Sequence, residues 1–525
     1  MARGAPDRNL VPRRLRLGLA AVVVAGLVLR VLLIIVAPRW GYAWDHFDIV
    51  GMGMVAGERG VTRVYSASKE ELPLLRGWVV QDGRPVTIQR RGVHLPNYPP
   101  LCTVVFWLQS AWLQARDPGF VVNTAYTRLV TSMTPWVFEL LTALGVGLLA
   151  RALTGVPRLG AAAGVATWLA PPLMMNTGLF AQYDALVLAP AVFAVLAMLG
   201  GHWARAGVCV GLGLLAKPQG LLIVPIAAFA ALVGSGPHSA TGPRAGGRRL
   251  AVMGTAAILT ILIGSAPWML ADGFAWVQRC YRVNFFEFLP YTTLEAFNLW
   301  YLLALVTERQ PVFDVLASTA TVAGFSRDAW GRLFLAVALV AIAALCWWRS
   351  RHRPALAIVL FAGLALWSMF IWPTRVHERY LLYCLPFMIV AATAMPRLRV
   401  ATVALLVVAT MEHSWMIWRS GPPLGSFDRR TTERLQDERF RIYWQGRPVT
   451  LESAKAGPKL EESVQLAFER YRADRHRSDR LEWLLTLLSL GAYVTAVGVS
   501  VAARAPTTLA SSRDDGAGDD VIASA

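Results

Sequence analysis

The stretch GLAAVVVAGLVLRVLLIIVAP, residues 18–38, contains a single charged side chain, Arg30. About 20 consecutive apolar residues are enough for a helix to cross the hydrocarbon layer of a bilayer. Similar runs recur along the 525-residue chain, which is 55% hydrophobic and only 16% charged, whereas soluble proteins carry about a quarter charged residues. The sequence therefore predicts an all-α polytopic membrane protein.

Twelve apolar runs of suitable length occur along the chain, several of them separated by short basic connectors, so we expect about 12 transmembrane helices. Placing the basic connectors in the cytoplasm follows the positive-inside rule and puts both chain termini on the cytoplasmic side. This arrangement also explains much of the net charge of +18 without nucleic-acid binding. The expected spans cover residues 17–37, 129–150, 159–178, 184–200, 203–216, 219–235, 250–270, 331–348, 355–373, 380–395, 399–418 and 481–503.

One further apolar run, residues 98–114, does not fit this count. If it crossed the membrane, every later basic loop would move to the outside. Because it is short and contains Gln109 and Gln114, we expect a helix lying in the outer membrane interface, within an external loop that covers residues 38–128. The apolar run after Asn298 is interpreted in the same way.

The chain thus divides into five parts along its length. We expect a cytoplasmic N-terminus, a membrane-embedded catalytic region, a charged extracytoplasmic segment with a short amphipathic helix, a last transmembrane helix and a disordered tail. These parts cover residues 1–16, 17–418, 419–480, 481–503 and 504–525.

Two carboxylates follow the first span, in the stretch GYAWDHFDIVGMGMV, residues 41–55. Asp45 and Asp48 lie at the outer end of a predicted helix, where a carboxylate in a low-dielectric environment is a candidate general base. The alternative is that these residues only cap the helix, which aspartate does well.

Two other polar stretches fall on the same side of the membrane. In the turn AQYD, residues 181–184, Gln182 and Asp184 would form a polar floor beneath an outer cavity, or simply make a turn between two spans. In AKPQ, residues 216–219, Lys217 precedes a helix-breaking proline. It either lines a cavity or extends to the membrane interface.

A cluster of charged residues, RVHER, occupies residues 375–379 between two apolar runs. Arginine suits bidentate contacts with phosphate, and Glu378 could orient a basic neighbour. The alternative is an interfacial anchor. With the carboxylates and Lys217, the cluster favours transfer chemistry on a phosphate-linked lipid, which needs a base and cations for the departing phosphate.

The order of these motifs resembles the GT-C superfamily of integral membrane glycosyltransferases. Within it, the chain is similar to the bacterial relatives of the GPI mannosyltransferases and of the dolichyl-phosphate-glucose glucosyltransferases. The resemblance covers residues 17–420. Two features depart from the pattern of the family: Ala181 stands where many relatives have glycine, and the charged segment 419–480 has no counterpart. The motifs that follow the acidic loop are NYPPL (97–101), AQYD (181–184), AKPQGLL (216–222), AFNLW (296–300) and RVHERYLLYCLP (375–386).

The resemblance implies a GT-C-like fold and an inverting transfer of one sugar, with a mannose-like hexose favoured. The donor would be a polyprenyl-phosphate sugar, the acceptor a lipid or glycan, and no metal or other cofactor would take part. The catalytic carboxylate maps onto Asp45, with Asp48 in reserve. Donor-phosphate contacts are expected from His377, Arg379, Lys217 and Arg128. Supporting or substrate-binding roles are expected for Glu378, Gln182, Tyr183, Asp184, Tyr98, Asn298 and Trp300.

Two other classes of function stay open at this point. One is a transporter or flippase of lipid-linked glycans, although no internal repeat is visible and Glu139 is the one clear acidic residue in mid-span. The other is a non-catalytic envelope assembly protein with the same fold. In each case we expect a multi-pass protein of the plasma membrane; an enzyme's active site would face the extracytoplasmic side. The oligomeric state is not predicted.

Overall fold

The computed structural model describes most of the chain, and the statements below concern that part. The described residues are 13–81, 84–91, 94–234, 243–286, 291–294, 296–307, 320–420, 442–444, 447–449 and 458–502. The predictions for residues 1–12, for the tail 504–525 and for half of the charged segment 419–480 lie outside these ranges.

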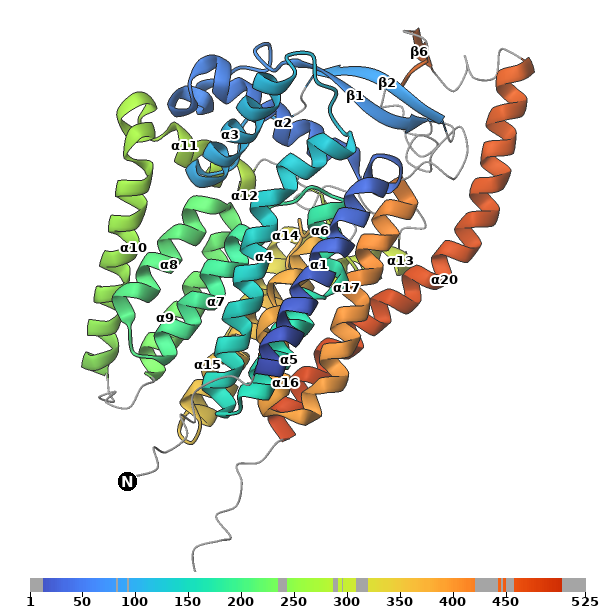
Figure 1. Ribbon diagram of the computed structural model, residues 1–525. Coiled ribbons are helices and arrows are strands. Elements are labelled where there is room, and N and C mark those ends of the chain that lie inside the picture. The colour runs from blue at the N-terminus through green and yellow to red at the C-terminus, as the bar shows by residue number, and fades with distance from the viewer. Residues whose placement is uncertain are drawn as a thin grey trace, which may run out of the picture.

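Long helices run side by side between the two ends of the molecule and form one bundle (Figure 1). α15 lies inside it and is buried along nearly its whole length. The bundle consists of α1 (Arg13–Trp40), α4 (Ala125–Thr154), α5 (Pro157–Trp168), α6 (Pro171–Gly178), α7 (Ala185–Leu199), α8 (Trp203–Ala216), α9 (Ile223–Val233), α10 (Pro243–Asp272), α14 (Arg327–Ser350), α15 (Pro354–Ile371), α16 (Leu385–Ala394), α17 (Arg399–Ser420) and α20 (Pro458–Ala502).

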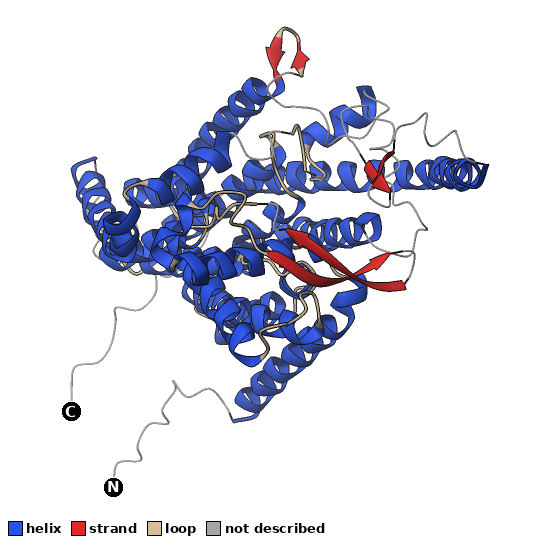
Figure 2. Cartoon of the chain, turned by 90° about the horizontal axis from the view of Figure 1, so that it is seen from above, coloured by secondary structure: helices blue, strands red, loops and turns tan. Residues whose placement is uncertain are grey.

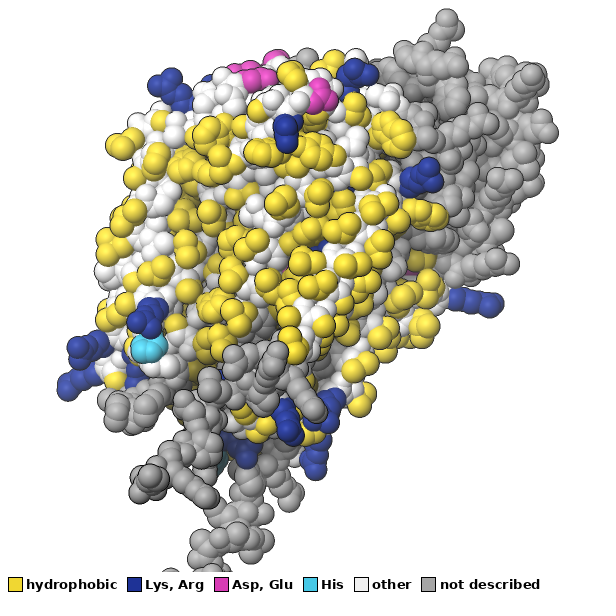
Figure 3. Space-filling model, in the orientation of Figure 1, with side chains coloured by type: hydrophobic (Ala, Val, Ile, Leu, Met, Phe, Trp, Pro, Cys, Tyr) yellow, Lys and Arg dark blue, Asp and Glu magenta, His cyan; other side chains and the backbone are white. Residues whose placement is uncertain are grey.

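Within the described residues, seven helices are long and apolar enough to cross a membrane: α1, α4, α10, α14, α15, α17 and α20. Their outward faces are apolar. On α10, for example, Ile263 is 75% and Leu270 89% exposed. Figure 3 shows apolar side chains over the middle of the molecule and basic ones gathered toward its two ends. The prediction of a mainly helical, multi-pass membrane protein is therefore confirmed.

The other five predicted spans coincide with shorter helices, so the total of twelve stays a prediction. Prolines explain why some of these segments are broken, because a proline lacks the amide hydrogen that continues a helix. Pro171 and Pro172 separate α5 from α6, and Pro218 begins the 3-10 helix η2 (Pro218–Leu222) ahead of α9. Before α16, the chain forms a second 3-10 helix, η4 (Glu378–Tyr383).

One end of the bundle carries a cap built from the segment between α1 and α4 (Figures 1 and 2). It contains α2 (Ala43–Arg59), the 3-10 helix η1 (Val61–Ser66), the antiparallel hairpin of β1 (Leu74–Gln81) and β2 (Arg84–Arg91), and α3 (Pro100–Arg116). The hairpin was not predicted, although Asp82-Gly83 between β-branched residues is a strong hairpin signal.

The predicted helix 98–114 is confirmed as α3, and it lies in the cap beside α2. Its close packing depends on Gly53, where an added Cβ would lie 2.2 Å from the main-chain oxygen of Phe106. Next to this contact, the Ser110 hydroxyl donates to the Val50 carbonyl over 3.1 Å. Whether α3 lies in a membrane interface stays a prediction.

Glu139 on α4, the acidic residue expected in the middle of a span, forms a buried ion pair. Arg30 of α1 donates from Nε to the Glu139 carboxylate over 2.7 Å, and both side chains are buried. The Arg30 guanidinium also lies 3.6 Å from the centre of the Trp168 ring, while Thr177 donates to Glu139. This pairing is the arrangement that intramembrane charges require.

The expected amphipathic helix near residues 459–475 and the last span belong to a single helix, α20, which packs against α17. The remaining short elements are α11 (Ala275–Val277), the π-helical turn η3 (Gln278–Val283), α12 (Asn284–Phe286), α13 (Leu299–Thr307), η5 (Pro396–Leu398), β3 (Thr321–Val322), β4 (Phe325–Ser326), β5 (Ile442–Trp444) and β6 (Arg447–Val449).

Candidate active site

Four polar segments that are far apart in the sequence meet beneath the cap. They are the first turn of α2, the turn between α6 and α7, the junction of α8 with η2, and the linker from α15 to η4. Their side chains form a continuous network from Asp45 to Asp184, and all four segments had been predicted to face the same side of the membrane.

Asp45 lies in the first turn of α2 and is 23% exposed, so a substrate can reach it. Gln182 donates from Nε2 to its carboxylate, and Nη1 of Arg379 lies 3.8 Å from Oδ2. Burial raises the pKa of Asp45 above its usual range, although the Arg379 guanidinium opposes the shift. A carboxylate with a raised pKa and an open face suits a general base.

Asp48 follows one turn later, yet its surroundings differ. Its Oδ2 lies 2.6 Å from Nδ1 of His94, and its side chain is 7% exposed. Residues three positions apart share a helix face, so Asp48 stays close enough to influence Asp45 electrostatically. Asp45 is therefore the better placed of the two candidate bases.

The turn between α6 and α7 brings Gln182 to the centre of the network. Nε2 of Gln182 faces Asp45, while its Oε1 accepts from Nζ of Lys217 over 3.4 Å. Lys217 thus fixes which end of the amide points to the carboxylate. Before Gln182, Ala181 has a φ of 56°, in the left-handed region that glycine adopts without strain. This geometry explains why glycine suits the position.

Asp184 forms the buried end of the network. Its Oδ1 accepts from Nζ of Lys217 over 2.7 Å and from the Tyr383 hydroxyl over 2.5 Å. Its Oδ2 accepts from Nδ2 of Asn176 over 3.1 Å. With both oxygens occupied and no exposed surface, Asp184 positions its neighbours and is not accessible to a substrate.

We predict that Lys217→Met lowers the free energy of unfolding by about 3–5 kcal/mol, because it leaves the buried Asp184 carboxylate without its cation. Thermal unfolding of the purified protein measures this loss. The double variant Lys217→Met/Asp184→Asn removes both charges and should recover part of it. Equal stabilities of wild type and Lys217→Met would contradict the assigned pairing.

Arg379 is held in place by the residues that precede it. Its Nη1 donates to Oε1 of Glu378 over 3.2 Å, and Nδ1 of His377 lies 3.5 Å from the other Glu378 oxygen. Burial alone would raise the pKa of Glu378, but Arg379 lowers it to about 2. Burial and the Arg379 charge lower the pKa of His377 to about 4. At neutral pH, His377 is therefore an uncharged hydrogen-bonding group beside a fixed cation.

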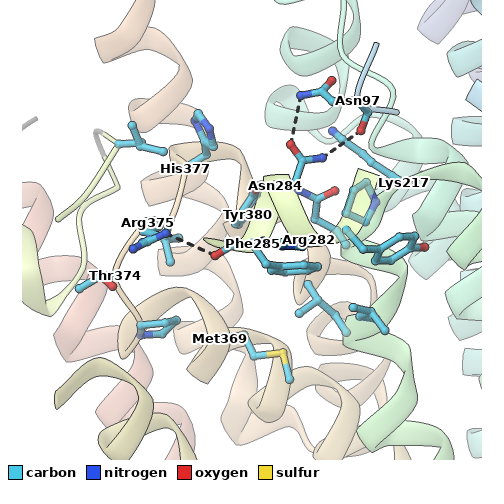
Figure 4. A pocket seen from close by; sticks show the side chains of 18 of the residues that line it. Asn97, Lys217, Arg282, Asn284, Phe285, Met369, Thr374, Arg375, His377 and Tyr380 are labelled. Carbon is cyan, nitrogen blue, oxygen red and sulfur yellow. Dashed lines mark hydrogen bonds between the residues drawn. The ribbon is translucent and has the colours of Figure 1, made fainter. Parts of the chain in front are cut away.

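A cavity of about 1080 Å³ opens next to this cluster (Figure 4). Its lining includes Lys217, His377 and Arg379, and it also includes apolar side chains such as Leu366 and Met369. Tyr98 also lines the cavity. The centre of its ring lies 5.6 Å from Nζ of Lys217. The space therefore joins cationic and hydrogen-bonding groups to an apolar region, as a phosphate-bearing lipid requires.

The structure does not bring Arg128 or Tyr183 to this cavity. The fully buried Arg128 donates to Oδ1 of Asn123 and to the main-chain oxygens of Tyr42, Gly178 and Leu179, which ties α2 to the turn after α6. Tyr183 donates to Gln109 and to the Thr131 carbonyl. Both side chains hold the cap on the bundle.

Asn298 and Trp300 likewise lie outside the cavity lining. Oδ1 of Asn298 accepts from the amides of Trp300 and Tyr301 and caps α13, as asparagine commonly does. Nε1 of Trp300 donates to the Trp372 carbonyl over 2.7 Å. The Trp300 contact holds the start of the linker that leads to His377 and then to Arg379 in η4.

Other residues of the site were not singled out from the sequence. Gln219 donates from Nε2 to the Tyr380 hydroxyl over 2.6 Å at the cavity wall, and Tyr383 contacts Asp184. Gln219, Tyr380 and Tyr383 fall in motifs that had been noted, AKPQGLL and RVHERYLLYCLP, so the motifs were the available signal. Asn97 and Asn284 also line the cavity.

Comparison with models of known protein families finds no match for this chain, and comparison with curated proteins finds none either.

Proposed function

We propose that the protein is an inverting glycosyltransferase. It moves one sugar from a polyprenyl-phosphate donor to a lipid or glycan acceptor, at the extracytoplasmic face of the plasma membrane. The observation that carries the proposal is the position of Arg379, which lines the large cavity and lies 3.8 Å from Asp45. A candidate base and a candidate phosphate site thus meet at one side chain.

The shape of the cavity supports a lipid-linked donor. Apolar residues from η2, α14 and α15 contribute to its lining, among them Leu222, Leu335 and Leu366. Such a wall suits a polyprenyl chain, whereas Arg379, Lys217 and neutral His377 suit a phosphate. A donor whose phosphate contacts Arg379 brings its sugar toward Asp45, which lies beside Arg379 but is not among the residues that line the cavity.

The proposed reaction is a single displacement. Asp45 accepts the proton of the acceptor hydroxyl while that oxygen forms a bond to the anomeric carbon. The bond from this carbon to the phosphate oxygen breaks, and polyprenyl phosphate leaves with its negative charge beside Arg379. A phosphate needs no protonation to leave, so one carboxylate suffices, unlike the pair that glycoside hydrolases use.

We predict that the rate of transfer falls as the pH is lowered, because Asp45 must be deprotonated to act as a base. Burial raises the pKa of Asp45, so the midpoint of this loss should lie above the ordinary aspartate value of 3.8. The neighbouring Asp48 carboxylate raises it further, and Asp48→Asn should therefore move the midpoint to lower pH. A midpoint that moves to higher pH, or does not move, would contradict the assignment.

The proposal is tested with the purified full-length protein, a panel of polyprenyl-phosphate sugars and membrane lipid extract as the source of acceptor. We expect transfer from one donor of the panel, with inversion at the anomeric carbon. The donor that gives product then identifies the sugar that the protein transfers. Absence of product from every donor, with protein that shows a cooperative thermal unfolding transition, would count against the proposal.

A further inference from the structure

The mouth of the cavity is formed by side chains that line it and are also exposed at the surface. Phe274 follows the end of α10, Phe285 belongs to α12 and Leu221 to η2, and all three are exposed apolar residues of the lining. Arg332, in the second turn of α14, also lines the cavity and is exposed. A ligand that enters here therefore meets a guanidinium beside two phenylalanine rings.

The mouth borders α10 and α14, two helices that are long and apolar enough to cross a membrane. Beside it, Leu270 on α10 and Leu333 on α14 are exposed, as expected of side chains that face lipid. Nη1 of Arg375 donates to the Phe285 carbonyl over 3.4 Å (Figure 4), and Nη2 donates to Asp328 at the start of α14. Both sides of the mouth thus lie at one end of the two helices, where a membrane-spanning segment reaches the lipid headgroups.

Arg332 is not neutralised by the carboxylate one turn before it. Asp328 and Arg332 are four positions apart on α14, a spacing at which opposite charges commonly pair. Instead, Oδ2 of Asp328 accepts from Nη2 of Arg375 over 2.9 Å, and Oδ1 accepts from the Thr374 hydroxyl. Among the described residues, no hydrogen bond or ion pair holds the Arg332 side chain. An exposed guanidinium is therefore left at the mouth for a ligand.

The linker that occupies Asp328 is held in a particular conformation. Arg375 has a φ of 60°, in the left-handed region that residues other than glycine rarely adopt. Gly331 on α14 permits the close approach, because an added Cβ would lie 3.0 Å from the amide nitrogen of Thr374. A strained backbone persists only where the surrounding contacts maintain it. The pairing of Asp328 with the linker is thus a fixed feature of the fold.

The chemistry of the mouth restricts what it can bind. A guanidinium recognises phosphate through charge-assisted hydrogen bonds, and exposed apolar side chains can bury the chain of a lipid. A neutral sugar has neither the charge nor the chain. Anchoring at the membrane surface accounts for an exposed arginine on α14, but not for its place in the cavity lining. A lipid phosphate satisfies both observations.

We propose that Arg332 forms a second phosphate site, at the mouth of the cavity, which binds the phosphate of the polyprenyl carrier before it reaches Arg379. This inference rests on the proposed function for the identity of the carrier. Arg332 is a binding residue for the entering lipid, and Asp328 is kept from pairing with it by Thr374 and Arg375.

The test measures the association of a carrier without a sugar and does not depend on transfer. Full-length protein in zwitterionic nanodiscs is immobilised on a biosensor, with empty nanodiscs as reference, and farnesyl phosphate is the short, soluble carrier. A charge at the rim of a binding site acts mainly on the association rate. Arg332→Gln should therefore lower the association rate constant about two- to fivefold, the effect of one exposed charge pair, and less at high salt. Arg332→Lys keeps the charge and should restore most of the rate.

The matched control is Arg39→Gln, because Arg39 is exposed at the end of α1 that leads into the cap and does not line the cavity. It should associate with farnesyl phosphate as wild type does. Farnesol, which lacks the phosphate, should associate equally with wild type and Arg332→Gln. Thermal unfolding of each variant confirms that it is folded.

Equal association rates of farnesyl phosphate with wild type and Arg332→Gln, or an equal loss in Arg39→Gln, would overturn the inference. Binding of inorganic phosphate that depends on Arg332 as strongly would also overturn it, since the site would then recognise free phosphate. Sugar transfer by a protein whose carrier association does not depend on Arg332 would overturn this inference alone. Association that depends on Arg332 in a protein that transfers no sugar would refute the proposed activity and leave the phosphate site standing.

Discussion

Asp45→Asn is expected to lower the rate of sugar transfer by about 10²–10⁴-fold, the range that a general base contributes. Asparagine is isosteric, and its side-chain oxygen can still accept from Nε2 of Gln182. The substitution therefore removes the base without removing that contact. Affinity for the polyprenyl-phosphate donor should stay within a few-fold of wild type, because Arg379, His377 and the apolar wall are unchanged. Single-turnover transfer and donor binding, measured on the same preparation, separate the two effects.

Asp48→Asn is the matched control, because it makes the same chemical change one helical turn away. Asp48 is paired with His94 and is more buried than Asp45, so this variant should retain most of the transfer activity at neutral pH. The opposite result, with Asp48→Asn inactive and Asp45→Asn active, would transfer the role of base to Asp48.

Arg379→Ala is expected to reduce the turnover number by about 10²–10³-fold, as removal of a group that stabilises developing charge commonly does. The loss should appear in turnover and also in affinity for polyprenyl phosphate, because the cation contacts the phosphate before and after the sugar leaves. Arg379→Lys keeps the charge but cannot make a bidentate contact with phosphate. We therefore expect its turnover number to lie between those of wild type and Arg379→Ala. Steady-state kinetics with the productive donor measures both variants.

Arg282→Ala provides the comparison for Arg379, since Arg282 also lines the cavity but is exposed. Its removal should change turnover by less than about tenfold. A similar loss in both variants would mean that the charge of the whole cavity matters and that Arg379 has no particular role. Unchanged turnover in folded Arg379→Ala would refute the phosphate site.

The helices were predictable because an apolar run long enough to cross a membrane indicates a membrane-spanning helix, independently of how the rest of the chain folds. The run at residues 18–38 became α1, and each later predicted span coincides with helix. The break at Pro218 was predicted as well, but the break between α5 and α6 and the joining of the last two expected helices into α20 were not. Proline and local packing decide the breaks at α5–α6 and η2, and α20 continues through a charged stretch that was expected to separate two helices.

The candidate site was predictable in part, because its motifs are short and each contributes one or two functional side chains. Asp45, Gln182, Lys217 and Arg379 were expected near one face, and the structure places them in one network. Arg128 was expected to bind the donor phosphate, but its N–H groups are occupied by main-chain oxygens of α2 and the α6–α7 turn. A sequence cannot distinguish an arginine that binds a ligand from one that binds its own backbone.

Asn97 is another residue whose side-chain contacts could not be predicted from the sequence. It belongs to the NYPPL motif, but nothing local indicates which way its side-chain amide points. That orientation follows from Asn284, 187 positions away along the chain, whose Oδ1 accepts from Nδ2 of Asn97. Likewise, the difference between Asp45 and Asp48 comes from contacts with Arg379 and His94, which the tertiary fold supplies.

The most direct test of the account follows the fate of a labelled sugar in proteoliposomes that contain the wild-type protein, the polyprenyl-phosphate donor and acceptor lipid. We predict that the label moves from the donor to the acceptor, and that one polyprenyl phosphate appears for each glycosylated product. Movement of the intact labelled donor across the bilayer, with the sugar still attached and no product formed, would contradict the account and identify a transporter.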